Sequence, residues 1–263
     1  MTQHSFVLDL DERIRSRKKM THPLYQTILG GSAPQKLLQN FVLHRIPIKS
    51  LWTRNIMGIA ARVEDYQLRA QLVSNIYEEE TGGLSQTIRH LETFFQFGEG
   101  VGLSRSEMRN PIILPETQSV IDHNTRACNS DMHFTAGVAS VLLLMEGQPP
   151  IVSDEGKSME DVMLKLYGLP ETHVVFFRLH ASHCGNASGV SDLEDEHAEV
   201  ARELLRKYCD TDELHQQATT FLERAIDLRH RHFDAIYNNF YDKSQKPFRW
   251  PGSASMIAAS PLA

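Results

Sequence analysis

Cysteine is scarce in this chain, and its few copies lie far apart. The three cysteines among 263 residues are Cys128, Cys184 and Cys209, and no two of them form a C-x-x-C pair. This distribution argues against a disulfide framework and against a cysteine-based zinc site. A reducing cytoplasm is therefore the setting that we expect for the protein.

The chain also lacks long apolar runs and clusters of basic residues. No apolar stretch approaches the length of a transmembrane helix, and the first five residues lack the basic and then apolar order of a signal peptide. The 33 acidic residues outnumber the 27 basic ones. This balance argues against nucleic acid or an anionic membrane as the main partner. We expect a cytoplasmic protein that acts on a small molecule, and a homodimer is compatible with that expectation.

Apolar residues at helical spacing, by contrast, are abundant. They recur from Phe6 to Ser16, from Gln35 to about Arg62, and from Glu213 to Tyr241. Pro47 is expected to kink the second of these helices. Nearly every residue from Met132 to Met145 is apolar or small, which indicates a helix that is buried on all sides. The sequence thus predicts an all-α protein.

No internal repeat and no linker divides the chain. We therefore predict one domain over residues 1–250, followed by a tail at residues 251–263. The apolar run Val174–Phe177 is compatible with a strand when it is considered alone. The helical pattern around it favours a buried helix that continues to His180.

Glu79 and His90 are the first pair of residues with the chemistry of a metal site. They are eleven residues apart, which is about three helical turns, so one continuous helix would direct both side chains to the same side. Gly82-Gly83 lies between them and is able to interrupt such a helix. A carboxylate and an imidazole that face the same way suit a metal ion.

Glu146 directly follows the apolar run that we expect in the core. An unpaired buried carboxylate costs several kcal/mol, so this side chain is at a solvated helix end, paired, or bound to a metal. The Gln148-Pro149-Pro150 segment keeps the solvated helix end open as an alternative.

Two histidines further along the chain have a similar character. His180 follows an apolar run, where a hydrogen-bonded structural histidine is the alternative to a ligand. His197 lies in an acidic segment, where a solvated surface is the alternative. Glu194 precedes His197 by three residues, a spacing that lets one helix offer both side chains to one metal ion. Carboxylates make up about half of this set of candidates, which suits iron or manganese better than structural zinc.

Several short motifs resemble one known family. They are His22-Pro23-Leu24-Tyr25, Asn75-Ile76-Tyr77-Glu78-Glu79-Glu80 with His90, Met145-Glu146-Gly147-Gln148-Pro149-Pro150, Tyr167-Gly168-Leu169 and Phe176-Phe177-Arg178-Leu179-His180. In this order they are similar to the heme-oxygenase-like diiron oxidases, whose superfamily includes pyrroloquinoline quinone synthase and thiaminase II. The similarity covers roughly residues 20–240.

The resemblance implies a single up-and-down bundle of seven to eight helices. It also implies two ferrous ions per chain, held by three carboxylates and three histidines, with O2 as co-substrate. Matched by position, Glu79, His90, Glu146, His180 and His197 take five of these six places.

The sixth place departs from the family pattern. An aspartate usually lies four residues after the first histidine of the last motif, and here that position is Cys184. We therefore expect Glu194 to replace it, with Asp192 or Asp195 as the alternatives.

The function that the resemblance implies is that of a non-heme diiron oxygenase or oxidase. Its substrate would be a small amine, amino acid or carboxylate, changed by N-oxygenation or oxidative C–C cleavage. Lys49, Arg45 and Arg178 are candidates to bind a substrate carboxylate, and no catalytic residue beyond the metal ligands is assigned. The alternatives are a metal-free oxidase like the quinone synthase and a non-catalytic helical protein that binds a ligand.

Overall fold

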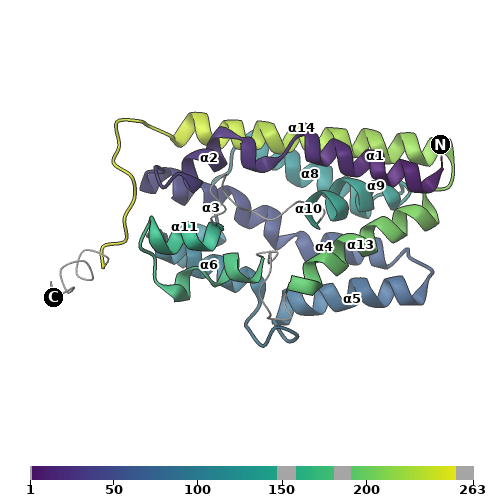
Figure 1. Ribbon diagram of the computed structural model, residues 1–263, viewed down its shortest axis with the longest axis horizontal. Coiled ribbons are helices and arrows are strands. Elements are labelled where there is room, and N and C mark those ends of the chain that lie inside the picture. Colours follow the sequence, from purple (N-terminus) through teal and green to yellow (C-terminus); the bar gives the residue numbers. More distant parts are fainter. Residues whose placement is uncertain (1, 147–157, 181–190, 253–263) are drawn as a thin grey trace, which may run out of the picture.

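The structure is a computed structural model that describes residues 2–146, 158–180 and 191–252, without the side chains of residues 191–197. The described part is all-α, as predicted (Figure 1). Its helices are α1 (Gln3–Ser16), α2 (Pro23–Leu29), α3 (Gln35–Ser50), α4 (Trp52–Ala60), α5 (Tyr66–Thr81), α6 (His90–Gly100), α7 (Arg105–Arg109), α8 (Pro115–Asn129), α9 (Thr135–Gly137), α10 (Leu144–Glu146), α11 (Met159–Lys165), α12 (Val175–Leu179), α13 (Ser191–Tyr208) and α14 (Asp212–Phe240). Two 3₁₀ turns, η1 (Lys19–Thr21) and η3 (Glu171–His173), and a π-helix, η2 (Val138–Leu143), complete the set. This is more segments than the seven to eight expected, because several of them are only three to seven residues long.

The helix that spans residues 135–146 forms the centre of the bundle. It consists of α9, η2 and α10 in succession, and residues 135–144 are all buried. It packs against α8, α13 and α14, and the 29-residue α14 runs the length of the molecule beside α1 (Figure 1). The prediction of a helix buried on all sides is confirmed. Its middle turn is a π-helix, a rare form that is frequent at functional sites.

Leu51 ends the first long helix earlier than the sequence predicted. The expectation was one kinked helix from Gln35 to about Arg62, but α3 ends at Ser50 and α4 begins at Trp52. Pro47 itself lies inside α3, and the break comes at Leu51, whose backbone N–H bonds to the carbonyl of Ile48 at 3.3 Å instead of to that of Pro47. The chain therefore changes direction one turn after the proline.

Two apolar clusters fill the interior, and α14 contributes to both. The distal core joins α1, α4, α5, η2, α13 and the first half of α14, and it is largely aliphatic. The site core joins α2, α3, α6, α11, α12 and the second half of α14, and it is rich in aromatic rings. Each aromatic side chain buries a large area, so these rings contribute much of the buried surface of the site core.

Other expectations have mixed outcomes. The run at residues 174–177 enters the helix α12, so the strand alternative is wrong. No helix in the described ranges has both the length and the apolar character to cross a membrane. The tail from residue 253 onward and Cys184 lie outside the described residues, and the division into one domain and a tail stays a prediction.

Candidate metal centre

The loop between α5 and α6 places the first candidate ligands. Asp65 caps the start of α5 by accepting hydrogen bonds from the backbone of Gln67 and Leu68. Gly82 ends the helix in the left-handed region with φ of 64°, where a Cβ atom would lie 2.6 Å from the carbonyl oxygen of Ile88. The chain then turns back, and His90 begins α6.

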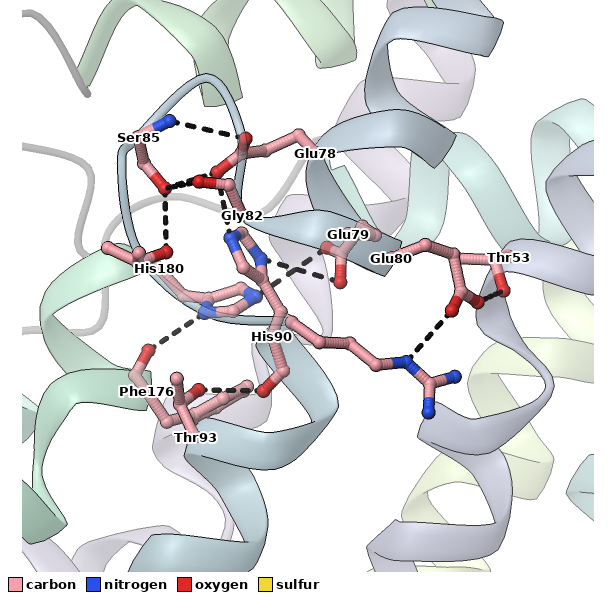
Figure 2. Close-up of polar contacts among 12 residues, drawn as sticks. Thr53, Glu78, Glu79, Glu80, Gly82, Ser85, His90, Thr93, Phe176 and His180 are labelled. Atoms are coloured by element: carbon pink, nitrogen blue, oxygen red, sulfur yellow. Dashed lines mark hydrogen bonds and ion pairs between the residues drawn. The ribbon is translucent and has the colours of Figure 1, made fainter.

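The continuous helix considered for residues 79–90 therefore does not form. Glu79 lies in the last turn of α5, and His90 is the first residue of α6. The two side chains meet because the loop of residues 82–89 returns the chain to the end of α5 (Figure 2).

Three of the predicted ligands converge on one point. The Nδ1 atom of His90 lies 3.4 Å from Oε2 of Glu79, and the Nε2 atom of His180 lies 3.7 Å from Oε1 of the same carboxylate. One donor atom from each residue lies within 4.8 Å of the others. Glu79 and His180 are half-buried and His90 is buried, so the donors are largely shielded from solvent (Figure 2).

Each of the two histidines uses its other ring nitrogen in a hydrogen bond. His180 lies at the C-terminal end of α12, where its Nδ1 atom donates to the carbonyl of Phe176 at 2.8 Å. The ring of Phe176 stacks on that imidazole, with 4.1 Å between centroids. The Nε2 atom of His90 lies 3.0 Å from Oε1 of Glu78. Hydrogen bonds of this kind orient metal-binding histidines in proteins.

The charges at this point favour a cation. Burial acts to raise the pKa of Glu79, but His180 and His90 outweigh burial and hold that pKa below its ordinary value. Burial acts to lower the pKa of His90, and Glu79 and Glu78 outweigh it in the opposite direction, so this pKa is raised.

The donor set fits a metal ion. In neutral histidines with the hydrogen bonds just described, Nδ1 of His90 and Nε2 of His180 carry lone pairs that face a carboxylate. The Nδ1 atom of His90 is buried without a hydrogen-bond partner. Three lone-pair-bearing atoms directed at one point repel one another unless a cation lies between them. As metal ligands, a mixed set of nitrogen and oxygen atoms suits iron.

The remaining predicted ligands have different outcomes. Glu146 ends α10 and is half-buried, but its carboxylate does not belong to the converging group of Glu79, His90 and His180. The backbone of residues 192–197 lies in the first turns of α13, whereas the side chains are outside the described residues. The assignments of His197, of Glu194 and of its alternatives Asp192 and Asp195 therefore stay predictions.

A small cavity of about 40 Å³ adjoins His180, one of the three converging residues. Its walls are Tyr25, Phe41, Arg45, Phe94, Met159, Phe176, Phe177 and His180. His180 thus contacts both the cavity and the metal-binding point. The walls belong mainly to the site core, and most of them are aromatic.

The three candidate substrate-binding cations lie in different surroundings. Arg45 lines the cavity and donates from Nη1 to the hydroxyl of Tyr25 at 3.0 Å. The Nζ atom of Lys49 lies over the ring of Phe176, 4.1 Å from its centroid. Arg178 is exposed and forms ion pairs with Glu160 at 2.6 Å and with Glu171 at 3.5 Å.

Glu78 is a buried residue beside the candidate site that the sequence did not indicate, since an acidic triplet is surface charge in most proteins. It is buried with 4% exposure and bonds to His90. The available signal was the buried face of α5, because Leu68, Leu72 and Asn75 continue at helical spacing to residues 78 and 79.

The fold and the converging donors define a class, that of helical proteins which hold a metal between a carboxylate and histidines. The profile of the iron-containing redox enzymes matches residues 39–230, and the chain belongs to this family. The protein is therefore an iron-dependent oxidoreductase, as the sequence predicted.

Relatives of similar length share low but extended sequence identity. The chain is 23% identical over 255 residues to a 4-aminobenzoate synthase of Nitrosomonas europaea, covering 91% of this chain and 94% of the relative. It is 25% identical over 203 residues to a 4-aminobenzoate synthase of Chlamydia pneumoniae, covering 77% of this chain and 82% of the relative.

Solved structures show the same fold at lower identity. A Shewanella denitrificans domain with a heme-oxygenase-like fold superposes with a TM-score of 0.62 at 15% identity, covering 90% of this chain and 91% of that one. A TenA homologue from Pseudomonas syringae pv. tomato gives a TM-score of 0.64 at 9% identity, covering 90% and 93%. The predicted heme-oxygenase-like architecture is confirmed.

Proposed function

We propose that the protein is a non-heme diiron oxygenase or oxidase that uses O2 to change a small aromatic amine or carboxylate. The observation that carries this proposal is the convergence of Glu79, His90 and His180 beside an aromatic cavity. When bound, ferrous iron supplies electrons and open coordination positions for the reduction of O2. Membership of the iron-containing redox enzymes supports this chemistry.

The two relatives named 4-aminobenzoate synthase suggest the chemical class of the product. We propose that this chain also forms 4-aminobenzoate. A benzoate combines a flat ring with a carboxylate, and the cavity combines aromatic walls with one guanidinium, that of Arg45. Guanidinium and carboxylate form paired, charge-assisted hydrogen bonds, which would orient the ring.

The candidate ligands and the cavity residues have separate tasks in this proposal. Glu79, His90 and His180 hold the first iron, and Glu146, His197 and Glu194, or Asp192 or Asp195 in place of Glu194, hold the second. Phe94 and Phe176 exclude water from the reacting group. Lys49, which lies over both of these rings, adds positive charge at the cavity wall.

The test is iron loading followed by turnover. Purified protein is loaded with ferrous iron without oxygen, and metal content, O2 consumption and formation of 4-aminobenzoate are then measured. We expect two irons per chain and product that depends on both iron and O2. His180→Ala should abolish both, whereas the matched control His232→Leu, which changes a buried histidine outside the converging group, should retain iron binding.

Other results would reject parts of the proposal. Oxidation without any bound metal would favour the metal-free alternative, and one iron per chain would limit the site to Glu79, His90 and His180. Absence of both iron binding and O2 consumption in folded protein would refute the proposed function and favour a ligand-binding protein.

A further inference from the structure

Glu78 makes more polar contacts than an exposed carboxylate that is solvated only by water. It accepts hydrogen bonds from the backbone N–H groups of Leu84 at 2.7 Å and of Ser85 at 3.2 Å, and from the hydroxyl of Ser85. Its Oε1 atom also lies 3.0 Å from Nε2 of His90 (Figure 2). One side chain therefore connects the loop between α5 and α6 to a candidate iron ligand.

These contacts determine which nitrogen of His90 carries the proton. Ionised carboxylates only accept hydrogen bonds, and of the two that face His90 only Glu78 meets the ring with hydrogen-bond geometry, at 3.0 Å from Nε2, so Nε2 is the donor. In the neutral ring the lone pair is then on Nδ1. That is the atom that faces Glu79 at 3.4 Å and is buried without a hydrogen-bond partner.

We propose that Glu78 is a positioning residue that holds His90 in the Nε2–H tautomer, so that Nδ1 is the atom that binds iron. The inference rests on the proposed function, because it takes Glu79 and His90 as ligands. The neighbouring carboxylates thus have different roles: Glu79 faces both histidines across the metal-binding point, and Glu78 faces the far side of one imidazole. Loss of such an outer hydrogen bond typically weakens metal binding by about 10- to 100-fold.

A purely structural role is the alternative, in which Glu78 only fastens the loop. The variants Glu78→Gln and Ser85→Ala separate the two roles. In Glu78→Gln the amide can accept from the loop through its oxygen and donate to Nε2 of His90, which would move the ring proton to Nδ1. Ser85→Ala removes one hydrogen bond from Glu78 to the loop and leaves the contact with His90 in place.

The experiment has two readouts on each protein. Long-range ¹⁵N–¹H NMR of the metal-free protein at alkaline pH reports the tautomer of His90, whose signals are assigned by their loss in His90→Gln. Anaerobic titration with ferrous iron reports affinity. We expect the Nε2–H tautomer and equal affinity in wild type and Ser85→Ala. For Glu78→Gln we expect the Nδ1–H tautomer and about 10- to 100-fold weaker binding.

Each contrary result has a definite meaning. Unchanged tautomer and affinity in Glu78→Gln would overturn the proposal, and so would equal weakening in Ser85→Ala. If Glu78→Gln does not fold, an Nδ1–H tautomer in wild type overturns the proposal by itself. Wild type with the Nε2–H tautomer but no affinity for iron would refute the proposed function instead, since the contact between Glu78 and His90 would remain.

Discussion

The candidate metal centre and the contact region of α3, α8 and α14 both bury histidines, and they differ in the charge that surrounds those histidines. In the candidate metal centre, His90 has 7% exposure and contacts the carboxylates of Glu78 and Glu79. Between α3, α8 and α14, His44 and His232 have 1% and 2% exposure, and neither contacts a carboxylate in the described part of the chain. Burial lowers the pKa of His44 and lowers that of His232 to about 3.

The difference shows what distinguishes a candidate ligand from a structural histidine in this fold. Burial alone favours the neutral ring in both regions. Carboxylates on both sides of His90 reverse the direction of its pKa shift and create a place for a cation. His232 instead bonds through Nδ1 to the hydroxyl of Thr117 at 3.1 Å, which provides no negative charge.

The largest expected difference between the two regions is in the iron content of variants that lack one of their histidines. His180→Ala removes one of three converging donors, so we expect loss of iron loading with an unchanged helical circular dichroism spectrum. His232→Leu should retain iron. Metal analysis after anaerobic loading is the measurement, and equal losses in the two variants would break the comparison.

Acid should destabilise the protein through protonation of His232, the buried histidine between α8 and α14. The pKa of His232 is about 3 when folded and near 6.5 when unfolded, so the unfolded state binds more protons between these values. Stability therefore falls as pH decreases through this window, by up to about 1.4 kcal/mol per pH unit from this group. Urea unfolding at several pH values measures the slope. His232→Leu should flatten it, and an unchanged slope would show that other groups carry the acid sensitivity.

A smaller effect is expected from the partner of His232. Thr117 is fully buried, and Thr117→Val removes its hydroxyl with little change in shape. The Nδ1 atom of His232 then loses its hydrogen bond, which should lower the free energy of unfolding by about 1–3 kcal/mol. Chemical denaturation measures this change. Iron affinity should stay at the wild-type value. A large loss of affinity would show that the surroundings of His232 and the candidate metal centre are energetically coupled.

The smallest effect is expected at Arg178. Its side chain is 43% exposed and paired with Glu160, so Arg178→Ala should change stability by about 0–1 kcal/mol. We also expect an unchanged rate of O2 consumption, because the guanidinium does not line the cavity. A raised KM in this variant would support the substrate-binding role that the sequence suggested, and would extend the site beyond the described cavity.

Local signals in the sequence located much of the fold correctly. Gly82 ends α5 at the place where the sequence offered a glycine able to interrupt the helix. Such signals succeed because a cap or a left-handed glycine acts within one turn of the chain. The break between α3 and α4 was not predicted in the same way, since Leu51, where it falls, is neither a glycine nor a proline.

The sequence by itself determined the helical class, the interruption at Gly82 and the donor chemistry of Glu79, His90 and His180. These follow from periodicity, capping and residue type, which are properties of short segments. Only the tertiary structure decided that a loop rather than a continuous helix brings Glu79 to His90, that Glu78 faces the opposite side of the imidazole, and that Arg178 lies in surface ion pairs. The reason is that hydrogen-bond partners and burial depend on segments that are distant in sequence, and these meet only when the bundle is packed.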